Sequence, residues 1–271
     1  PFSGTQAISG TRYTVVGKSP LTGTWGDANS GGFFSAFLKF AGYDAVFFKG
    51  ISEKPVFLFI DNGKAVLKSA AHLWGKDTYE TEDILKSELG KEIAIACIGP
   101  AGEKQSLISC IVHNKGSVAG RSGLGAVMGS KKLKAVVVKG NAEVPVADPE
   151  GIRKLREYYL PRLGGHIQMV RKYGTTFTTL PSAESGDSPV KNWGGITSID
   201  FPDATPLGAE PLDSLKLKST GCYRCPVGCE ALLKEGKGEY RYSAGSFRPE
   251  YETLAMLGPN CANNNLESIV K

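Results

Sequence analysis

Short segments in the first half of the chain either alternate hydrophobic and polar residues or form hydrophobic runs. Both patterns are typical of β-strands, which are predicted over residues 11–16, 45–50, 55–61, 65–67, 93–98, 106–112 and 135–138. Asn62-Gly63 separates two of these strands and favours a tight turn, so 55–61 and 65–67 are expected to form a hairpin. The strand over 106–112 is expected to be the partner of 93–98.

Apolar residues at helical spacing, together with helix-start signals, predict helices over 33–40, 77–89, 148–163 and 248–257. The last three begin with acidic residues or proline, which are favoured at helix N-termini. The composition changes after Pro145, and residues 164–200 are rich in Gly, Ser, Thr and Pro. We therefore expect a domain boundary near residue 146, which gives domains 1–146 and 147–271.

The composition narrows the class of protein. The chain has 271 residues, of which 41% are hydrophobic, and its net charge of +5 includes no long basic run. It is therefore long enough for one large or two modest cores, and nothing indicates a nucleic-acid partner. No apolar run approaches the roughly 20 residues of a membrane span, so a soluble protein is expected. The chain starts at Pro1 and stops in an unfinished helical pattern, which reads as an internal piece of a longer protein.

Three cysteines, Cys222, Cys225 and Cys229, lie within eight residues in the order Cys-x2-Cys-x3-Cys. Three thiolates on one loop can hold three corners of an iron–sulfur cluster or half of a zinc site. The three histidines are distant in sequence, which disfavours zinc. Six scattered cysteines without a secretory signal do not make a disulfide scaffold and point to a reducing cytoplasm. The nearest downstream thiol that could complete a cluster is Cys261.

Two glycine-rich segments are candidates for binding an anion. Asn29-Ser30-Gly31-Gly32 precedes the helix predicted over 33–40, so Asn29 or Ser30 is either a helix cap or part of a site whose N–H groups bind a phosphate. Residues 116–131 match neither the dinucleotide fingerprint nor the P-loop, because their glycines have the wrong spacing. They still form a small-residue segment with one cation, Arg121, which lets the backbone approach a bulky anion closely.

Taken together, these segments resemble the tungsten-containing aldehyde ferredoxin oxidoreductase family. The matching segments keep their order and cover nearly the whole chain: Arg12–Tyr13, Lys18–Gly23, Ala28–Gly32, Lys39–Ala45, Gly99–Glu103, Ala119–Arg121, Gly125–Lys131, the cysteine loop 221–229 and Pro249–Glu252. The resemblance implies an α+β fold. An N-terminal base domain of two β-sheets with flanking helices would carry the metallopterin, and a mainly helical domain would start after it.

The resemblance also implies cofactors and the residues that hold them. The cofactors are a tungsten or molybdenum bis-pterin, a 4Fe-4S cluster, and magnesium bridging the pterin phosphates. Cys222, Cys225 and Cys229 match three cluster ligands, and the family's fourth cysteine lies beyond residue 271. The pterin-binding residues implied are Arg12, Asn29, Ser30, Gly31, Val118, Ala119, Gly120 and Arg121. The matching catalytic residue is Glu252, as general base.

Two positions depart from the family pattern. Ser117 stands where aldehyde enzymes tend to have arginine. Cys261 follows Glu252 by nine residues, where a relative, the active-site subunit of tungsten benzoyl-coenzyme A reductase, is thought to ligate tungsten with cysteine. A soft thiolate suits that metal, so Cys261 is a candidate tungsten ligand.

The resemblance implies a cytoplasmic oxidoreductase that oxidises aldehydes to carboxylic acids and passes electrons through the cluster to ferredoxin or another low-potential carrier. The alternative is the active-site subunit of an acyl-coenzyme A reductase of the benzoyl-coenzyme A type. A third class is a non-catalytic iron–sulfur or zinc module. The further partners expected are more copies of the chain or an electron-transfer subunit.

Overall fold

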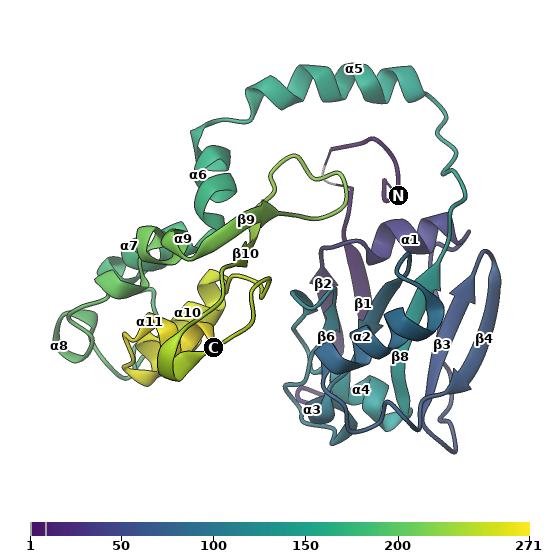
Figure 1. The fold of residues 1–271 in the computed structure, drawn as a ribbon, viewed down its shortest axis with the longest axis horizontal. Helices are drawn as coiled ribbons and strands as arrows, with labels where there is room; N and C mark the ends of the chain where they lie inside the picture. The colour runs from purple at the N-terminus through teal and green to yellow at the C-terminus, as the bar shows by residue number, and fades with distance from the viewer. Residues whose placement is uncertain (1, 9) are drawn as a thin grey trace. The chain divides into compact units, whose positions relative to one another are not determined.

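The chain divides into two compact units in the computed structural model, which describes residues 2–8 and 10–271 (Figure 1). The first unit comprises Pro1–Glu157 and Cys222–Cys225, and the second comprises Tyr158–Gly221 and Pro226–Lys271. Four residues of the cysteine loop are therefore grouped with the first unit, although the chain reaches them from the second.

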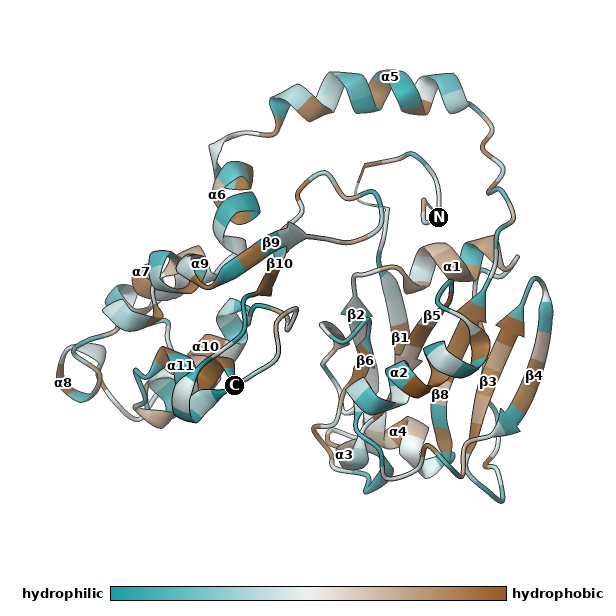
Figure 2. Cartoon of the chain, viewed as in Figure 1, coloured by the Kyte–Doolittle hydropathy of each residue, from teal (hydrophilic) through white to brown (hydrophobic). Residues whose placement is uncertain are grey.

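A six-stranded sheet forms the centre of the first unit. Its order is β4-β3-β8-β5-β6-β7, and β3 and β8 are the parallel pair. The strands are β3 (Val56–Asp61), β4 (Lys64–Ser69), β5 (Ala94–Cys97), β6 (Ile111–His113), β7 (Ser117–Ala119) and β8 (Leu133–Lys139). Figure 2 shows hydrophobic residues along β3 and β8. Nearly every residue of β8 is buried, as expected for a strand covered on both faces.

Successive residues of the sheet face two different cores. Ala135 and Val137 of β8 pack with Leu85 of α2 (Thr78–Leu89). Val136 and Val138 belong to the opposite core, with α1 (Phe34–Phe40), α4 (Leu124–Ser130) and the two-stranded sheet of β1 (Tyr13–Lys18) and β2 (Trp25–Ser30). The short helix α3 (Pro100–Glu103) contacts α4. Full burial of one such aliphatic side chain contributes about 1.5–3 kcal/mol, so these two cores hold β1–β2 and the helices in place.

The second unit is mainly helical. Its helices are the end of α5 (Pro149–Tyr159), then α6 (Gly165–Tyr173), α7 (Thr179–Ser185), α8 (Thr197–Asp200), α9 (Ala209–Ser214), α10 (Tyr251–Leu257) and α11 (Leu266–Val270). Single 3-10 turns lie at Leu160–Arg162, Gly174–Thr178, Thr205–Leu207, Gly238–Tyr240 and Pro259–Cys261. Leu207, Leu212 and Leu254 are fully buried in its core. A hairpin of β9 (Lys216–Thr220) and β10 (Glu230–Leu233) carries the cysteine loop. The predicted α+β class is confirmed.

None of the helices in the described part of the chain combines the length and the apolar character that crossing a bilayer requires. The six cysteines, all among the described residues, form no disulfide bonds. Cys97 is buried in β5, and this burial raises the pKa of its thiol to about 12.

Several predicted elements are confirmed. The hairpin at Asn62-Gly63 joins β3 to β4, and α2 begins after Asp77, whose side chain forms a capping box with Glu80. The strand predicted over 93–98 is β5. The strand predicted over 106–112 does pair with β5, but only its last residues form a strand, because β6 begins at Ile111.

Three predictions were wrong, and one helix was missed. Residues 45–50 form no strand, because no described strand runs beside them, and Phe47 is 90% exposed. Asn29 and Ser30 end strand β2 and cap no helix. The last predicted helix begins at Tyr251, after Pro249. Residues 124–130 form helix α4, which was not predicted. Its glycines serve packing, since a Cβ at Gly129 would lie 1.9 Å from a carbonyl oxygen of α3.

Candidate functional site

Arg12 and Asn29 lie together at one end of the β1–β2 sheet. The Nε of Arg12 donates to the side-chain oxygen of Asn29, and its Nη2 donates to the Asn29 carbonyl at 3.3 Å. Asn29 in turn donates from Nδ2 to the hydroxyl of Thr14 on the neighbouring strand, 3.2 Å away. Both side chains are exposed. The structure therefore fixes an exposed guanidinium beside the first glycine-rich segment, as a site for an anion requires.

The helix that follows this segment does not present its first N–H groups to a ligand. The N–H groups of Phe33 and Phe34 donate to Nε2 of His113 at 2.9 and 3.1 Å. Nδ1 of the same ring lies 2.6 Å from the carbonyl of Ile95, so this nitrogen carries the proton. Burial lowers the pKa of His113 to about 4 and keeps the ring neutral. The expectation that these N–H groups bind a phosphate is therefore wrong for Phe33 and Phe34.

The cysteine loop contacts the same segment within the first unit. The N–H of Tyr223 donates to the Gly32 carbonyl at 3.1 Å, and the Tyr223 ring packs edge-on against Phe33 and Phe40. A Cβ at Gly31 would lie 2.6 Å from the Sγ of Cys222 and 3.7 Å from Nη1 of Arg12. The thiol and the guanidinium are thus neighbours of one glycine. The sequence separates them by about 200 residues, and the structure brings them together.

The second glycine-rich segment lies beside the first. Strand β7, which contains Val118 and Ala119, contacts β2 and is the terminal strand of its sheet. The hydroxyl of Ser122 donates to the Asp27 carbonyl at 3.1 Å, which ties the two segments together. Val118, Gly120 and Arg121 are exposed, and Ala119 is buried. An exposed strand edge leaves backbone groups unused by the sheet, and these suit a ligand with phosphates.

The loop that carries the three cysteines is tightly folded at its base. Thr220 pairs with Glu230 across the hairpin, and a Cβ at Gly221 would lie 2.8 Å from the Gly228 Cα. Arg224 and Gly228 adopt left-handed backbone conformations, at φ 51° and 58°. These two conformations let the backbone turn tightly within a short loop, and three thiolates on one such loop suit a compact cluster.

Two arginines of the second unit hold the second arm of this loop. Arg171 donates from Nη2 to the Pro226 carbonyl at 2.6 Å. Arg248 donates from Nη2 to the Cys229 carbonyl, also at 2.6 Å. The sequence signalled neither residue, because each is a lone arginine whose partners lie in other segments.

The three cysteines of the loop do not all belong to one unit. Cys222 and Cys225 belong to the first unit and Cys229 to the second. Across residues 2–8 and 10–271, no group of three or more His, Cys, Asp or Glu side chains is close enough to hold a metal ion. The fit to an iron–sulfur cluster therefore depends on the chemistry of three thiolates on one tight loop, and the fit to a pterin depends on the exposed groups around Gly31.

Glu252 and Cys261 both lie in the second unit, Glu252 in α10 and Cys261 in the 3-10 turn that follows it. Glu252 is in the first turn, and its exposed carboxylate has no hydrogen-bond or ion-pair partner in the described part of the chain. The Cys261 thiol, also exposed, donates to the Met256 carbonyl at 3.3 Å. Met256 follows Glu252 by four residues, about 6 Å along a helix axis. Neither side chain is required by the core, so both are available for chemistry.

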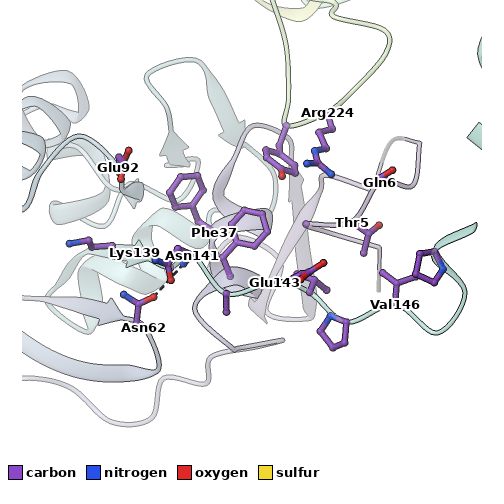
Figure 3. A pocket seen from close by; sticks show the side chains of 18 of the residues that line it. Thr5, Gln6, Phe37, Asn62, Glu92, Lys139, Asn141, Glu143, Val146 and Arg224 are labelled. Carbon is purple, nitrogen blue, oxygen red and sulfur yellow. Dashed lines mark hydrogen bonds between the residues drawn. The ribbon is translucent and has the colours of Figure 1, made fainter. Parts of the chain in front are cut away.

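Two cavities of the first unit adjoin these segments. One has a volume of about 840 Å³ and is lined by Phe37, Phe40, Tyr223 and Arg224 together with polar residues such as Asn62 and Lys139 (Figure 3). The other, about 780 Å³, is mostly apolar and reaches Arg12. Neither is lined by Glu252 or Cys261.

Comparisons with known proteins match this arrangement along the whole chain. The family model for the N-terminal domain of aldehyde ferredoxin oxidoreductase matches residues 1–140, and that for domains 2 and 3 matches residues 161–271. The chain is 42% identical to the tungsten-containing aldehyde ferredoxin oxidoreductases of Pyrococcus furiosus and of Thermococcus kodakarensis. Each alignment covers 100% of this chain and 44% of the relative, so the chain spans less than half of their length.

A solved structure is also similar to nearly the whole chain. The active-site complex BamBC of benzoyl coenzyme A reductase, in complex with 1,5-dienoyl-CoA, superposes with a TM-score of 0.78 at 30% sequence identity. The superposition covers 96% of this chain and 41% of the solved chain. Since the two family models span both units and the identity extends from end to end, the chain belongs to the aldehyde ferredoxin oxidoreductase family.

Proposed function

We propose that the protein containing this chain oxidises aldehydes to carboxylic acids and passes the electrons through a 4Fe-4S cluster to ferredoxin. The supporting observation is the contact between Cys222 and Gly31, which brings a proposed cluster ligand against the proposed pterin-binding segment. An oxidoreductase that moves electrons from one cofactor to another needs such a short path. The identity to tungsten-containing relatives supports a tungsten pterin as the first of these cofactors.

The pterin is held, in this proposal, by groups of the first unit. Arg12 supplies a guanidinium beside the first segment, and the backbone of 29–31 and 118–121 supplies donors for the phosphates and carbonyls for their magnesium. Cys222, Cys225 and Cys229 ligate the cluster, with a fourth ligand from elsewhere. We also propose that residues 1–146 form the base domain and that residues 147–271 form the start of the helical domain.

The metal site, once loaded, supplies a Lewis acid that polarises the aldehyde carbonyl and an acceptor for two electrons. Glu252 acts as the general base that takes a proton from the attacking water. One aldehyde and one water give one carboxylic acid, two protons and two electrons. Because ferredoxin accepts electrons singly, each turnover would require two single-electron transfers.

The assay uses the full-length protein, purified without oxygen, with viologen dye and a panel of aliphatic and aromatic aldehydes. Dye reduction by a sample that contains tungsten or molybdenum together with iron is the expected result. A sample that contains zinc but none of these metals would overturn the catalytic proposal and favour a zinc-structured module.

The structural similarity to benzoyl coenzyme A reductase favours one second candidate, the reduction of an acyl-coenzyme A. In that reaction electrons flow from the cluster to the substrate, and Cys261 is the candidate tungsten ligand. A metal-replete sample that is silent with aldehydes but oxidises reduced viologen when an aromatic acyl-coenzyme A is added would establish this candidate. Dye reduction with aldehydes would leave Cys261 outside the mechanism. In either case, cysteines that form no disulfide bonds suit a cytoplasmic enzyme.

A further inference from the structure

Arg248 places a buried positive charge against the backbone of Cys229. We propose that Arg248 is a positioning residue that fixes the Cys229 arm of the loop and raises the reduction potential of the cluster bound there. The inference rests on the proposed function in one respect, that Cys229 ligates an iron–sulfur cluster. It adds a residue of the second unit to the determinants of electron transfer.

The guanidinium is held by hydrogen bonds in a fixed position. Nη2 donates to the Cys229 carbonyl at 2.6 Å and Nη1 to the Lys172 carbonyl at 3.3 Å. The backbone N–H of Arg248 donates to the Ala231 carbonyl at 2.8 Å, two residues beyond Cys229. The residue is only 5% exposed. Arg248 therefore holds the chain on both sides of Glu230, directly after the third cysteine.

The backbone leaves room for this contact at Gly174. A Cβ there would lie 2.3 Å from Nη2 of Arg248 and 3.0 Å from the Cys229 carbonyl oxygen, and Gly174 has φ +68°. Any side chain would push the guanidinium away and strain the backbone. The packing around Cys229 is thus arranged to admit an arginine.

The positive charge of Arg248 is only partly compensated. Its nearest carboxylate oxygen is Oδ1 of Asp213, 3.9 Å from Nη1, and the same oxygen also pairs with Lys216. Burial lowers the pKa of the guanidinium, and Glu250, Asp213 and the Cys229 thiolate act in the opposite direction. An arginine remains charged in proteins because its ordinary pKa is above 12. Arg248 therefore keeps a positive charge beside Cys229 that Asp213 offsets only in part.

That charge acts on the reduced cluster more strongly than on the oxidised one. Reduction adds one electron to the cluster, and the potential of such clusters depends on net charge, hydrogen bonds and solvent exposure. A buried cation is weakly screened, so it stabilises the extra negative charge. Removing it should make the potential more negative.

Arg171 is a matched control on the same arm. It donates to the Pro226 and Val227 carbonyls at 2.6 and 3.4 Å, but its side chain is exposed. Its charge is screened by water and salt, so it should anchor the loop with little effect on the potential. A purely structural role for Arg248 predicts the same behaviour for both arginines.

The experiment is a redox titration of the full-length, metal-replete protein without oxygen, followed by the electron paramagnetic resonance of the reduced cluster. Arg248→Gln should lower the equilibrium constant for one-electron reduction about tenfold, a shift of about 59 mV to more negative potential. Arg248→Lys keeps the positive charge, so its potential should lie close to that of the unsubstituted protein. Arg171→Gln should shift the potential far less than Arg248→Gln. Iron per protein is measured in every sample.

Asp213→Asn keeps the proposal testable if Arg248→Gln fails to fold or to bind iron. This substitution removes the carboxylate that partly offsets the charge of Arg248, so the reduction potential of the cluster should become more positive. Iron-replete variants whose potentials equal that of the unsubstituted protein would overturn the proposal, as would an equal shift in Arg171→Gln. An unsubstituted protein without any cluster would overturn the proposed function instead.

Discussion

The Sγ of Cys222 lies 2.6 Å from the position that a Cβ would take at Gly31. Real carbon and sulfur atoms do not approach so closely without displacement. The chain around Cys222 is fixed by the hydrogen bond from Tyr223 N–H to the Gly32 carbonyl, at 3.1 Å. A thiolate bound to iron cannot rotate away to make room. Gly31 is therefore required by the cysteine loop.

Gly31→Ala should therefore lower the iron content of the protein. The added methyl group displaces the Cys222 thiol, and a cluster missing one ligand is lost during purification. We expect iron per protein to fall to less than half. Gly164→Ala is the control, because a Cβ there has nothing within 4 Å and the residue has an ordinary φ of −72°. Full iron in Gly31→Ala would argue against Cys222 as a ligand.

His113 should make the stability of the first unit depend on pH. Its pKa is about 4 when folded, because burial disfavours the charged ring, and about 6.5 when unfolded. The unfolded chain therefore binds the proton first as the pH falls. The contribution is fully present above pH 6.5 and is lost progressively towards pH 4, by about 3 kcal/mol in total.

Urea unfolding at several pH values measures this effect. In His113→Gln, the side-chain oxygen can still accept from the N–H groups of Phe33 and Phe34, but the side chain no longer titrates. The decrease in unfolding free energy between pH 7 and pH 4 should therefore be smaller in this variant by about 3 kcal/mol. Equal pH profiles for the two proteins would contradict the buried, neutral state of His113.

The sequence predicted the elements that depend on neighbouring residues. The hairpin of β3 and β4 and the start of α2 after Asp77 follow from a hydrophobic run, a turn and an acidic helix start, all within a few residues. Strand β2 was missed because its buried positions are Gly26, Ala28 and Ser30, whose small side chains give no hydrophobic alternation. A pattern of small residues carries little signal even when the strand is well packed.

The site was predicted only as far as it resembles known motifs. The spacing of the three cysteines indicated a cluster loop, and two glycine-rich segments indicated an anion. The contacts of His113 with Phe33 and of Arg248 with Cys229 join residues 80 and 19 positions apart. No local pattern specifies such partners, because they depend on how the strands and helices pack.

Removing one partner of the buried ion pair of Lys134 and Glu103 should strongly destabilise the first unit. Lys134 is fully buried and donates to the Lys76 carbonyl at 2.7 Å, while the Glu103 carboxylate accepts from Gly75 N–H at 2.8 Å. Lys134→Met leaves a buried carboxylate without its cation, which costs about 3–5 kcal/mol. Unfolding in urea should show this loss.

A second substitution tests the origin of that loss. Glu103→Gln in the Lys134→Met background removes the unpaired charge, so the double variant should be more stable than Lys134→Met alone. If the double variant were as unstable as the single one, lost packing rather than an unpaired charge would be the cause.

Glu252→Gln tests the catalytic base directly. The substitution keeps the size of the side chain but removes the proton acceptor, so turnover with aldehydes should fall about 10²–10⁴-fold. Tungsten and iron contents should stay unchanged, because Glu252 is an exposed residue of the first turn of α10 and holds no other group within the described chain.

Glu267→Gln is the matched control, since Glu267 is an exposed carboxylate in the first turn of α11. Both substitutions weaken the favourable interaction of an acid with a helix N-terminus, which is worth about 0.3–1 kcal/mol. A loss of turnover confined to Glu252→Gln would therefore come from chemistry, and equal, small effects in the two variants would remove Glu252 from the mechanism.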